Sequence, residues 1–471
     1  MQDARKRRAF ACCFATVVAL GVYGWIQNSV LFPRFAEFFP VGREIDTAVR
    51  AALYIAVAVV ASRKPNLLDA RTISATSIVA VASATALLYA AVSMESNGLA
   101  ILGIVFFEIG HIWIVVMYGL ALCLLATPRH SALAVAFGTV AGDIIQGIVG
   151  VFPLEVGMAA MAGLPLVALA LSYAPAARFL SMLQSEAAPS ELEIANPRSF
   201  LAPTNALFAC ILVFSAASGY ALTLNEVDNA PNSSPAEWMG TLAVALLMMS
   251  RRKPGGEDML FSLSALLVIA GFLAAPLTFG TDDAGANALL RIGKNCFDVL
   301  VWMTVASIGK QNPFSLLIAL GIANAARSIG TIAGAIAGHT VNDFAPVAEP
   351  FAHTITACAL FAFVAFLWLG FRNFSFERTI RGLEMPQTAQ QNDDREDVFD
   401  KRCFTIARDR GLTERETEIF LFMAHGRNVG FIEEHFVISR NTVKTHVKRI
   451  YKKLDVHSQQ ELIDLAESEP R

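Results

Sequence analysis

Residues 98–126 read GLAILGIVFFEIGHIWIVVMYGLALCLLA, and this stretch decides the character of most of the chain. Among Asp, Glu, Lys, Arg and His, it contains only Glu108 and His111. A helix needs roughly 20 apolar residues to cross the hydrocarbon core of a bilayer, so the stretch predicts a membrane-spanning helix. Its two ionisable residues therefore need a special environment.

The composition extends this prediction to most of the chain. Of 471 residues, 55% are hydrophobic and 16% are charged, whereas soluble domains carry about 25% charged residues. About twelve apolar stretches have the required length. They lie near residues 9–31, 46–62, 72–93, 98–126, 131–152, 155–174, 204–224, 236–250, 259–279, 286–309, 314–338 and 350–371. The first is not followed by a small-residue cleavage site, so it is not a removable signal. We expect an all-α protein with a polytopic membrane domain over residues 1–375.

The chemistry-bearing residues do not form the pattern of an enzyme. The seven cysteines are an odd number without C-x-x-C spacing, which indicates neither a disulfide framework nor a zinc site. No nucleophile constellation or phosphate-binding loop is present in the sequence. We therefore expect no metal, no cofactor and no catalytic activity.

Basic residues are concentrated in alternate connections between the apolar stretches. They are Arg5, Lys6, Arg7, Arg8, Arg63, Lys64, Arg71, Arg129, Arg178, Arg198, Arg251, Arg252, Lys253, Lys310, Arg372, Arg378 and Arg381. The positive-inside rule places these connections in the cytoplasm. The sequence thus predicts a multi-pass protein of the inner (cytoplasmic) membrane with both termini in the cytoplasm.

The membrane part contains an internal repeat. Residues 108–111 (EIGH) and 291–294 (RIGK) begin equivalent stretches, and this register also aligns Gly138 with Gly321. Two six-helix halves in the same orientation, joined by the polar residues 185–199, resemble the parallel-repeat layout of the major facilitator family. Chance similarity between alanine-rich helices is the alternative. The loop after the second stretch lacks the glycine and Asp-Arg pattern common in facilitator transporters, which argues against active transport.

Several ionisable residues lie inside the apolar stretches, where contact with lipid is costly. They are Glu108, His111 and Asp143 in the first half and Arg291, Lys294, Asp298 and Arg327 in the second. One interpretation is a cluster of salt bridges that holds the halves together. The other is a pocket in which a small-molecule ligand competes for these pairs. Arg291 and Lys294 would suit an anionic or zwitterionic ligand.

Glycine recurs at four-residue spacing in the eleventh stretch, at Gly330, Gly334 and Gly338. Small residues at this spacing let two helices approach closely. We expect packing within the bundle rather than dimerisation through lipid.

The character of the chain changes after residue 375. Residues 376–410 mix charges with proline, glutamine and asparagine and have little apolar content. Such a segment is typical of a linker. It is also too short to hold an α/β receiver domain.

Residues 411–471 have the pattern of a small four-helix domain. Thr413 and Glu416 form a capping box at the start of a first helix, and Ser439 is a suitable N-cap for a third. The stretches 412–416 (LTERE), 438–447 (ISRNTVKTHV) and 450–454 (IYKKL) resemble, in order, the helix-turn-helix domain of the LuxR family. This resemblance implies a domain that binds double-stranded DNA.

In the LuxR family the third helix is the recognition helix and the fourth commonly supplies the dimer contact, which implies a homodimer on DNA. The residues that carry over as DNA-binding are Arg440, Asn441, Thr442, Val443, Lys444, Thr445, Lys448, Arg449 and Lys452. Lys444 and Lys448 would hold phosphates, while Asn441, Val443 and Thr445 would approach bases. The second helix departs from the family pattern at Gly430 and Phe431.

Two functions fit this sequence. The first is a membrane-bound one-component transcription regulator that senses a small molecule through its membrane domain. The second is a facilitator-like transporter with a DNA-binding regulatory tail. Both imply DNA, membrane lipid and an unidentified small molecule as partners, and neither fixes the ligand or the target promoters.

Overall fold

A computed structural model describes most of the chain. The described residues are 2–63, 67–123, 125, 128–149, 153–184, 206–250, 256–311, 313–371, 376, 399, 402–424, 432, 440–457 and 459–467. Over these residues the regular structure is helical, apart from one isolated bridge between Val227 and Ala230. The chain divides into two compact units, Met1–Glu384 and Met385–Arg471.

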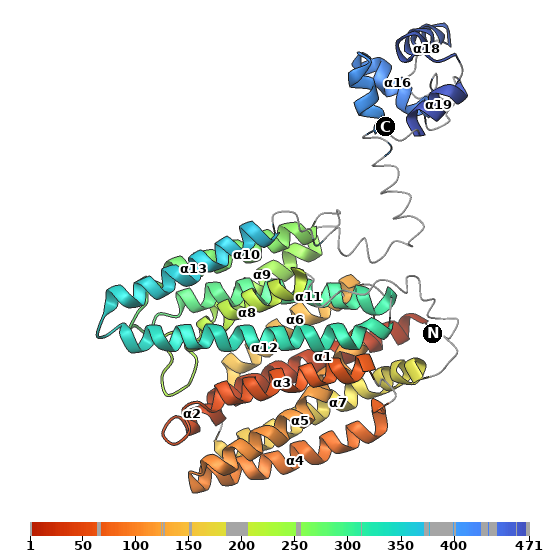
Figure 1. Ribbon diagram of the computed structural model, residues 1–471. Helices are drawn as coiled ribbons and strands as arrows, with labels where there is room; N and C mark the ends of the chain where they lie inside the picture. Colours follow the sequence, from red (N-terminus) through yellow and green to blue (C-terminus); the bar gives the residue numbers. More distant parts are fainter. Residues whose placement is uncertain are drawn as a thin grey trace. The chain divides into compact units, whose positions relative to one another are not determined.

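Long helices laid side by side make up the first unit (Figure 1). Its first half contains α1 (Gln2–Ile26), the π-helical turn η1 (Gln27–Leu31), α2 (Phe32–Phe35), α3 (Gly42–Arg63), α4 (Ala70–Met94), α5 (Asn97–Cys123), α6 (Pro128–Val149) and α7 (Leu154–Gln184). Its second half contains α8 (Ala206–Thr223), α9 (Ala236–Ser250), α10 (Gly256–Ala274), the 3-10 turn η3 (Ala275–Leu277), α11 (Gly285–Gln311), α12 (Pro313–Phe344) and α13 (Glu349–Phe371).

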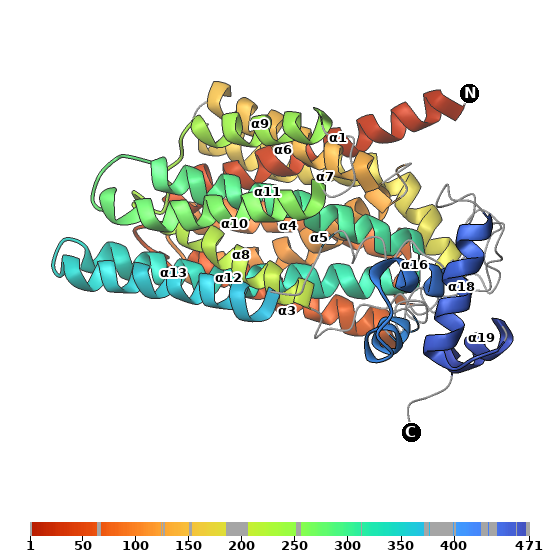
Figure 2. The same ribbon diagram turned by 90° about the horizontal axis from the view of Figure 1, so that it is seen from above.

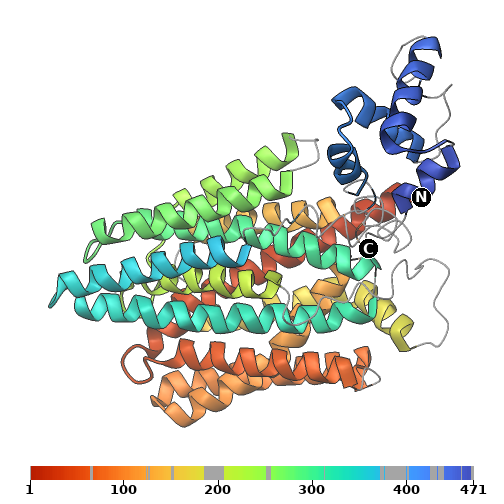
Figure 3. The same ribbon diagram turned by 45° about the horizontal axis from the view of Figure 1, so that its top comes forward.

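The same helix pairs recur in the two halves. Helix α4 packs on α5 as α10 packs on α11, α1 on α6 as α8 on α12, and α3 on α5 as α9 on α11. The halves meet where α3 packs on α12 and α6 on α9 and α11. Figures 1 and 2 show α12 beside both α8 and α3, and in Figure 3 the first half, in red and orange, extends to the side opposite the green and cyan helices. The predicted architecture of two six-helix halves is confirmed.

Nine described helices are long and apolar enough to cross a membrane, so the first unit is a multi-pass membrane domain. They are Arg7–Phe35, Gly42–Arg63, Ala70–Met94, Asn97–Cys123, Leu154–Ser181, Ala206–Thr223, Glu257–Leu277, Leu316–Phe344 and Glu349–Phe371. The sequence predicted about twelve. Three helices in expected positions, α6, α9 and α11, fall outside the nine. The apolar part of α9, Ala236–Leu246, is short, and the apolar sequence of α11 is interrupted by Arg291, Lys294 and Asp298.

The glycine series on α12 allows close packing against α8. A Cβ atom at Gly330 would collide with the carbonyl oxygen of Leu212, and one at Gly334 would collide with that of Ala216. Both carbonyls belong to α8. Packing within the bundle, as predicted, accounts for the series.

The second unit has a small core of its own. It contains α16 (Glu414–Ala424), α18 (Arg440–Leu454) and α19 (Gln459–Glu467). The predicted capping box at the start of α16 is confirmed, since Thr413 N donates to Glu416 Oε2 at 2.9 Å and Glu416 N donates to Thr413 Oγ1 at 3.3 Å. The core side chains include Phe420, Ile432, Ile450, Leu454 and Leu462. Ser439, Gly430 and Phe431 lie outside the described residues.

At both ends of the predicted linker 376–410, some residues pack on one of the two units and so are not part of a free tether. Phe376 is fully buried in the first unit, where its ring lies 5.2 Å from that of Phe261 and its N–H donates to Asp258 Oδ1 at 2.7 Å. Residues 402–409 are helical and bury Cys403 and Ala407 in the core of the second unit. Cys403 and Ala407 are four positions apart, so both lie on the same face of this helix, and that face packs on the core. Gly411, at φ +64°, then turns the chain into α16.

Candidate functional site

Two ion pairs occupy equivalent places in the two halves of the membrane domain with their charges reversed. In the first half, Arg50 on α3 contacts Glu108 on α5 at 2.8 Å. In the second half, Glu237 on α9 contacts Arg291 on α11 at 3.1 Å. Because α3 and α9 are the equivalent helices, as are α5 and α11, these pairs support the repeat. They also show that each pair is internal to one half.

The Arg50–Glu108 pair belongs to a larger buried group, the first charge cluster (Gln27, Asp46, Arg50, Glu108 and His111). Arg50 also contacts Asp46 Oδ2 at 2.5 Å, and Gln27 Nε2 donates to Asp46 Oδ1 at 3.1 Å. Asp46 and Glu108 are 2% and 0% exposed. The His111 ring packs on the rings of Tyr23 and Phe107, and its Nδ1 lies 4.0 Å from Glu108 Oε2.

The second charge cluster (Lys294, Asp298 and Arg327) lies on α11 and α12. Lys294 Nζ contacts Asp298 Oδ2 at 2.6 Å, and an Arg327 guanidinium nitrogen contacts Asp298 Oδ1 at 3.0 Å. The predicted residue Asp143 lies on α6 with a half-buried side chain.

The ion pairs described for Glu108, Arg291, Lys294 and Arg327 lie within single halves. The predicted set was expected, on one reading, to hold the two halves together. Glu108 instead pairs with Arg50 of its own half, and Arg291 pairs with Glu237 of its own half. Lys294 and Arg327 both pair with Asp298, also within one half.

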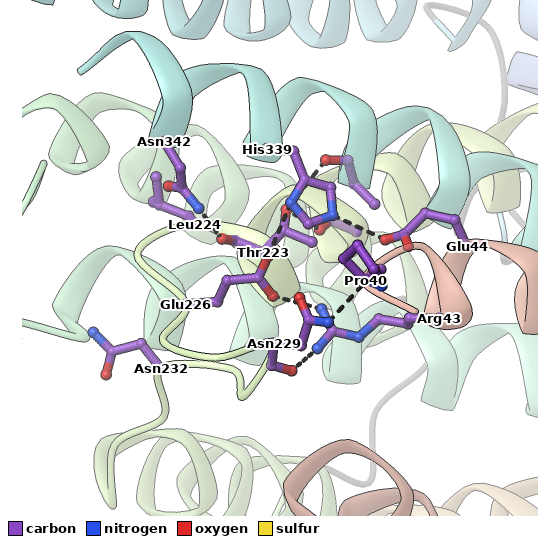
Figure 4. A network of polar contacts seen from close by, with 12 residues as sticks. Pro40, Arg43, Glu44, Thr223, Leu224, Glu226, Asn229, Asn232, His339 and Asn342 are labelled. Carbon is purple, nitrogen blue, oxygen red and sulfur yellow. Dashed lines mark hydrogen bonds and ion pairs between the residues drawn. The ribbon is translucent and has the colours of Figure 1, made fainter. Parts of the chain in front are cut away.

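A different polar network joins the halves, as shown in Figure 4. Arg43 at the start of α3 contacts Glu226, in the connection after α8, at 2.7 Å. His339 near the end of α12 contacts Glu44 of α3 through Nε2 and Glu226 through Nδ1, both at 2.9 Å. Asn229 adds two contacts, since it donates to the Pro40 carbonyl at 3.2 Å and its own carbonyl accepts from Arg43. We call Arg43, Glu44, Glu226, Asn229 and His339 the cross-half network.

The geometry around His339 fixes its protonation. Each ring nitrogen lies at hydrogen-bond distance from a carboxylate oxygen. An ionised carboxylate only accepts hydrogen bonds, so both nitrogens must donate and the imidazole is a cation. Two cations and two carboxylates therefore alternate across the boundary between the halves.

Sequence reasoning missed Asp46, Arg50 and His339. A signal for the first two was present, since an acidic and a basic residue four positions apart inside an apolar stretch must pair with something. His339 lies near the end of an apolar stretch, and its carboxylate partners come from the other half and from a loop. No local pattern connects those three positions.

In the second unit, α18 presents a basic outer face. The side chains of Lys444, Thr445, Lys448, Arg449 and Lys452 are exposed. Those of Arg440, Asn441 and Thr442 lie outside the described side chains, although their backbone is helical.

Val443 departs from the expectation that it approaches a base. Its side chain is 0% exposed and packs in the domain core with Ile450 and Leu454. The reason is its position on the apolar stripe of an amphipathic helix, which must face the core.

Lys453 has a structural role on the same helix. Its ammonium donates to Glu416 Oε2 at 2.6 Å and to the Gly411 carbonyl at 2.8 Å, which ties α18 to the start of α16. Burial raises the pKa of Glu416, but the Lys453 ammonium and the hydrogen bonds from Thr413 outweigh this effect and lower it below its usual value.

Comparisons with known proteins agree with this geometry. Residues 410–466 match the family model of bacterial regulatory proteins of the luxR family. The C-terminal domain is a LuxR-type helix-turn-helix domain. Over 58 residues it is 48% identical to the "Uncharacterized response regulatory protein YgeK" of Escherichia coli (strain K12). Over 60 residues it is 42% identical to the "Transcriptional activator protein ExaE" of Pseudomonas putida.

These likenesses are confined to the LuxR-type domain. The matched part is 12% and 13% of this chain and spans 40% and 28% of the two relatives.

Solved transporter structures are similar to the membrane domain. The human organic anion transporter MFSD10 is 12% identical, with 78% of this chain and 99% of that chain covered and a TM-score of 0.48. A bacterial homologue of the iron transporter ferroportin is 13% identical, with 80% and 99% covered and a TM-score of 0.49. The nucleoside transporter NupG is 16% identical, with 79% and 99% covered and a TM-score of 0.45.

Proposed function

We propose that this protein is a membrane-bound one-component transcription regulator. The observation that carries the proposal is that one chain holds both a multi-pass membrane domain and a LuxR-type domain. The membrane domain senses a small molecule, and the LuxR-type domain binds promoter DNA as a homodimer.

The basic face of α18 is the proposed DNA contact. Lys444 and Lys448 are exposed and would neutralise phosphates, while Thr445 and Asn441 would reach base edges. Arg440, Thr442, Arg449 and Lys452 complete the set. Val443 supports the helix from inside the domain.

The orientation follows from the distribution of basic residues. The connections that carry Arg7, Arg8, Arg63, Arg71 and Arg251 would lie in the cytoplasm by the positive-inside rule. Both termini would then be cytoplasmic, with the domain boundaries near residues 375 and 411. This arrangement would give the LuxR-type domain access to the chromosome from the inner membrane.

Sensing requires that the ligand bind two arrangements of the membrane domain unequally, because otherwise no equilibrium shifts. Holding two weakly dimerising domains on one membrane raises their effective concentration, so a small change in spacing can change DNA occupancy. The charge clusters of the two halves are the candidate ligand contacts.

Two measurements test this function. A reporter fused after Arg471 should be active in the cytoplasm, and the purified full-length protein should bind its target promoter with an affinity that falls steeply as salt rises. Transcript profiling of a deletion strain across candidate small molecules would then identify the regulon and the inducer. A reporter on the outer side, or no salt-sensitive DNA binding, contradicts the proposal.

Transport is the competing function, favoured by two equivalent halves that each hold ionisable residues within their helices. Uptake by vesicles that contain the protein separates the two. Saturable accumulation of a substrate would support a transporter with a regulatory tail. Binding without accumulation would support the regulator.

A further inference from the structure

We propose that the membrane domain binds a small zwitterion, a molecule with an ammonium group and an anionic group, between the first and second charge clusters. This inference rests on the proposed sensing function and names the chemical class of its ligand. It is carried by the charge balance of the clusters, by unpartnered buried polar atoms, and by the placement of the clusters at one level of the bundle.

The first charge cluster has two carboxyl groups and one guanidinium. Among the described residues, Asp46 and Glu108 are both buried carboxylates, and both contact one guanidinium, that of Arg50. His111 does not balance the second carboxylate, because its Nδ1 is buried without a hydrogen-bond partner in the described structure. An imidazolium would have to donate from both nitrogens. Because a buried charge without a partner is costly, one of the two carboxyl groups keeps its proton in the absence of a ligand, and a ligand ammonium can take the place of that proton.

The Tyr23 hydroxyl beside this cluster also supports a ligand site. Tyr23 is 3% exposed, its hydroxyl is buried without a partner among the described residues, and its ring lies 4.9 Å from that of His111. Arg50 keeps 25% of its side chain exposed. The cluster is therefore buried, incomplete in its hydrogen bonding and still accessible at one edge.

The second charge cluster has two cations and one carboxylate. Lys294 and Arg327 both contact Asp298, the one carboxylate described beside them. They keep 24% and 27% of their side chains exposed. The Nε atom of Arg327 is buried and has no hydrogen-bond partner within the described residues. An anion would balance this cluster.

The two clusters lie at a common level on neighbouring helices. Helices α3 and α12 run antiparallel, because Gly321 lies against Tyr54 and Ala58 at one point and His339 contacts Glu44 at another. From the first point, Arg327 lies 6 residues further along α12, and Arg50 lies 4 residues from Tyr54 and 8 from Ala58 along α3. Since both helices rise by the same distance per residue, the two arginines, and with them the clusters, lie at about the same level.

One molecule with both charges can satisfy both clusters. Its ammonium would donate to Asp46 and Glu108, and its anionic group would accept from Lys294 and Arg327. A molecule with only one of these charges can contact only one of the two clusters in this way. Since the clusters belong to different halves, a zwitterion would also draw the halves together.

The test uses the purified full-length protein in lipid nanodiscs at pH 7. Calorimetric titration compares glycine, 4-aminobutyrate and 6-aminohexanoate with the butyl and hexyl amines and the corresponding carboxylates. We expect one of the three amino acids to bind at least about tenfold more tightly than the single-charge compounds, because each charged hydrogen bond adds roughly that factor. If no amino acid binds more tightly than the single-charge compounds, the proposal is overturned.

Variants then assign each charge. Glu108→Gln should reduce the amino acid to the affinity of its carboxylate analogue, and Arg327→Gln should reduce it to that of the amine. Glu349→Gln removes a 69% exposed carboxylate on α13 and should leave the preference unchanged. An equal loss in all three variants would contradict the assignment. The comparison of probes on the unmodified protein stands if a variant does not fold.

A promoter-binding assay on the same preparation separates this inference from the proposed function. Tight amino-acid binding without any change in DNA occupancy would support the ligand class and overturn sensing. Normal DNA binding with no preference for a zwitterion would overturn the ligand class and leave the regulator standing.

Discussion

His339 on α12 donates from Nε2 to Glu44 Oε1 on α3 at 2.9 Å, and this contact ties the second half of the membrane domain to the first. Its Nδ1 lies 2.9 Å from Glu226 Oε1, and Glu226 also holds Arg43 of the first half at 2.7 Å. The His339 imidazolium therefore joins the two halves in two ways, directly through Glu44 and indirectly through Glu226 and Arg43.

Replacing His339 should loosen this boundary. His339→Ala removes the hydrogen-bond donor of Glu44 Oε1 and that of Glu226 Oε1. This loss should lower the free energy of unfolding by about 1–3 kcal/mol. Thermal unfolding of the purified protein in detergent measures the change. His353→Ala is the matched control, because the His353–Glu349 pair is 46% and 69% exposed and should contribute little. Equal effects of the two substitutions would show that the cross-half network is not structural.

Substitution of the packed glycines should separate α12 from α8. Gly334→Ala puts a methyl group against the Ala216 carbonyl, so the helices must shift, with a destabilisation of about 1–3 kcal/mol. Gly163→Ala on α7 is the control, because no heavy atom lies within 4 Å of its added Cβ. It should leave the unfolding temperature unchanged or raise it slightly. A neutral Gly334→Ala would contradict the close approach.

A lysine on the basic face of α18 should contribute to DNA affinity through charge. Lys448→Ala should weaken binding to all sequences and reduce the slope of log K against log salt by about 0.9, the value for one phosphate contact. Fluorescence anisotropy with fragment 385–471, which contains its own core, measures the slope. Lys453→Ala should leave the slope unchanged and lower stability, because Lys453 contacts Glu416. If the slope for Lys448→Ala were unaltered, Lys448 would not contact a phosphate, which would contradict the proposed DNA-binding face of α18.

The stability of the LuxR-type domain should fall in acid through Glu416. Burial opposes ionisation, but Lys453 and Thr413 together lower the pKa of Glu416 below its usual 4.5. A lowered folded-state pKa stabilises the domain above the unfolded value, and that contribution is lost as pH falls through the folded value. Urea unfolding of fragment 385–471 should therefore show a loss of stability below pH 4.5. Glu416→Gln should be less stable at pH 7 and show a smaller loss. If the stability of the unmodified fragment and that of Glu416→Gln changed with pH in parallel, Glu416 would not be the cause of the acid sensitivity.

The helices and their repeat could be predicted from the sequence because their cause is local. Apolar runs such as residues 98–126 must form helices in a membrane, since lipid offers no partner for backbone polar groups. The capping box of Thr413 and Glu416 and the basic face of α18 are also set by residues within a few positions of one another. Each of these features was expected and is present.

Sequence alone thus determined a helical membrane domain of two halves followed by a LuxR-type domain, because apolar run length, helical spacing and an ordered motif are properties of neighbouring residues. Only the tertiary structure decided which charges meet. Glu108 finds Arg50, 58 positions away, and His339 finds Glu44, 295 positions away. Pairing over such separations depends on how the helices pack, and no pattern among neighbouring residues encodes that packing.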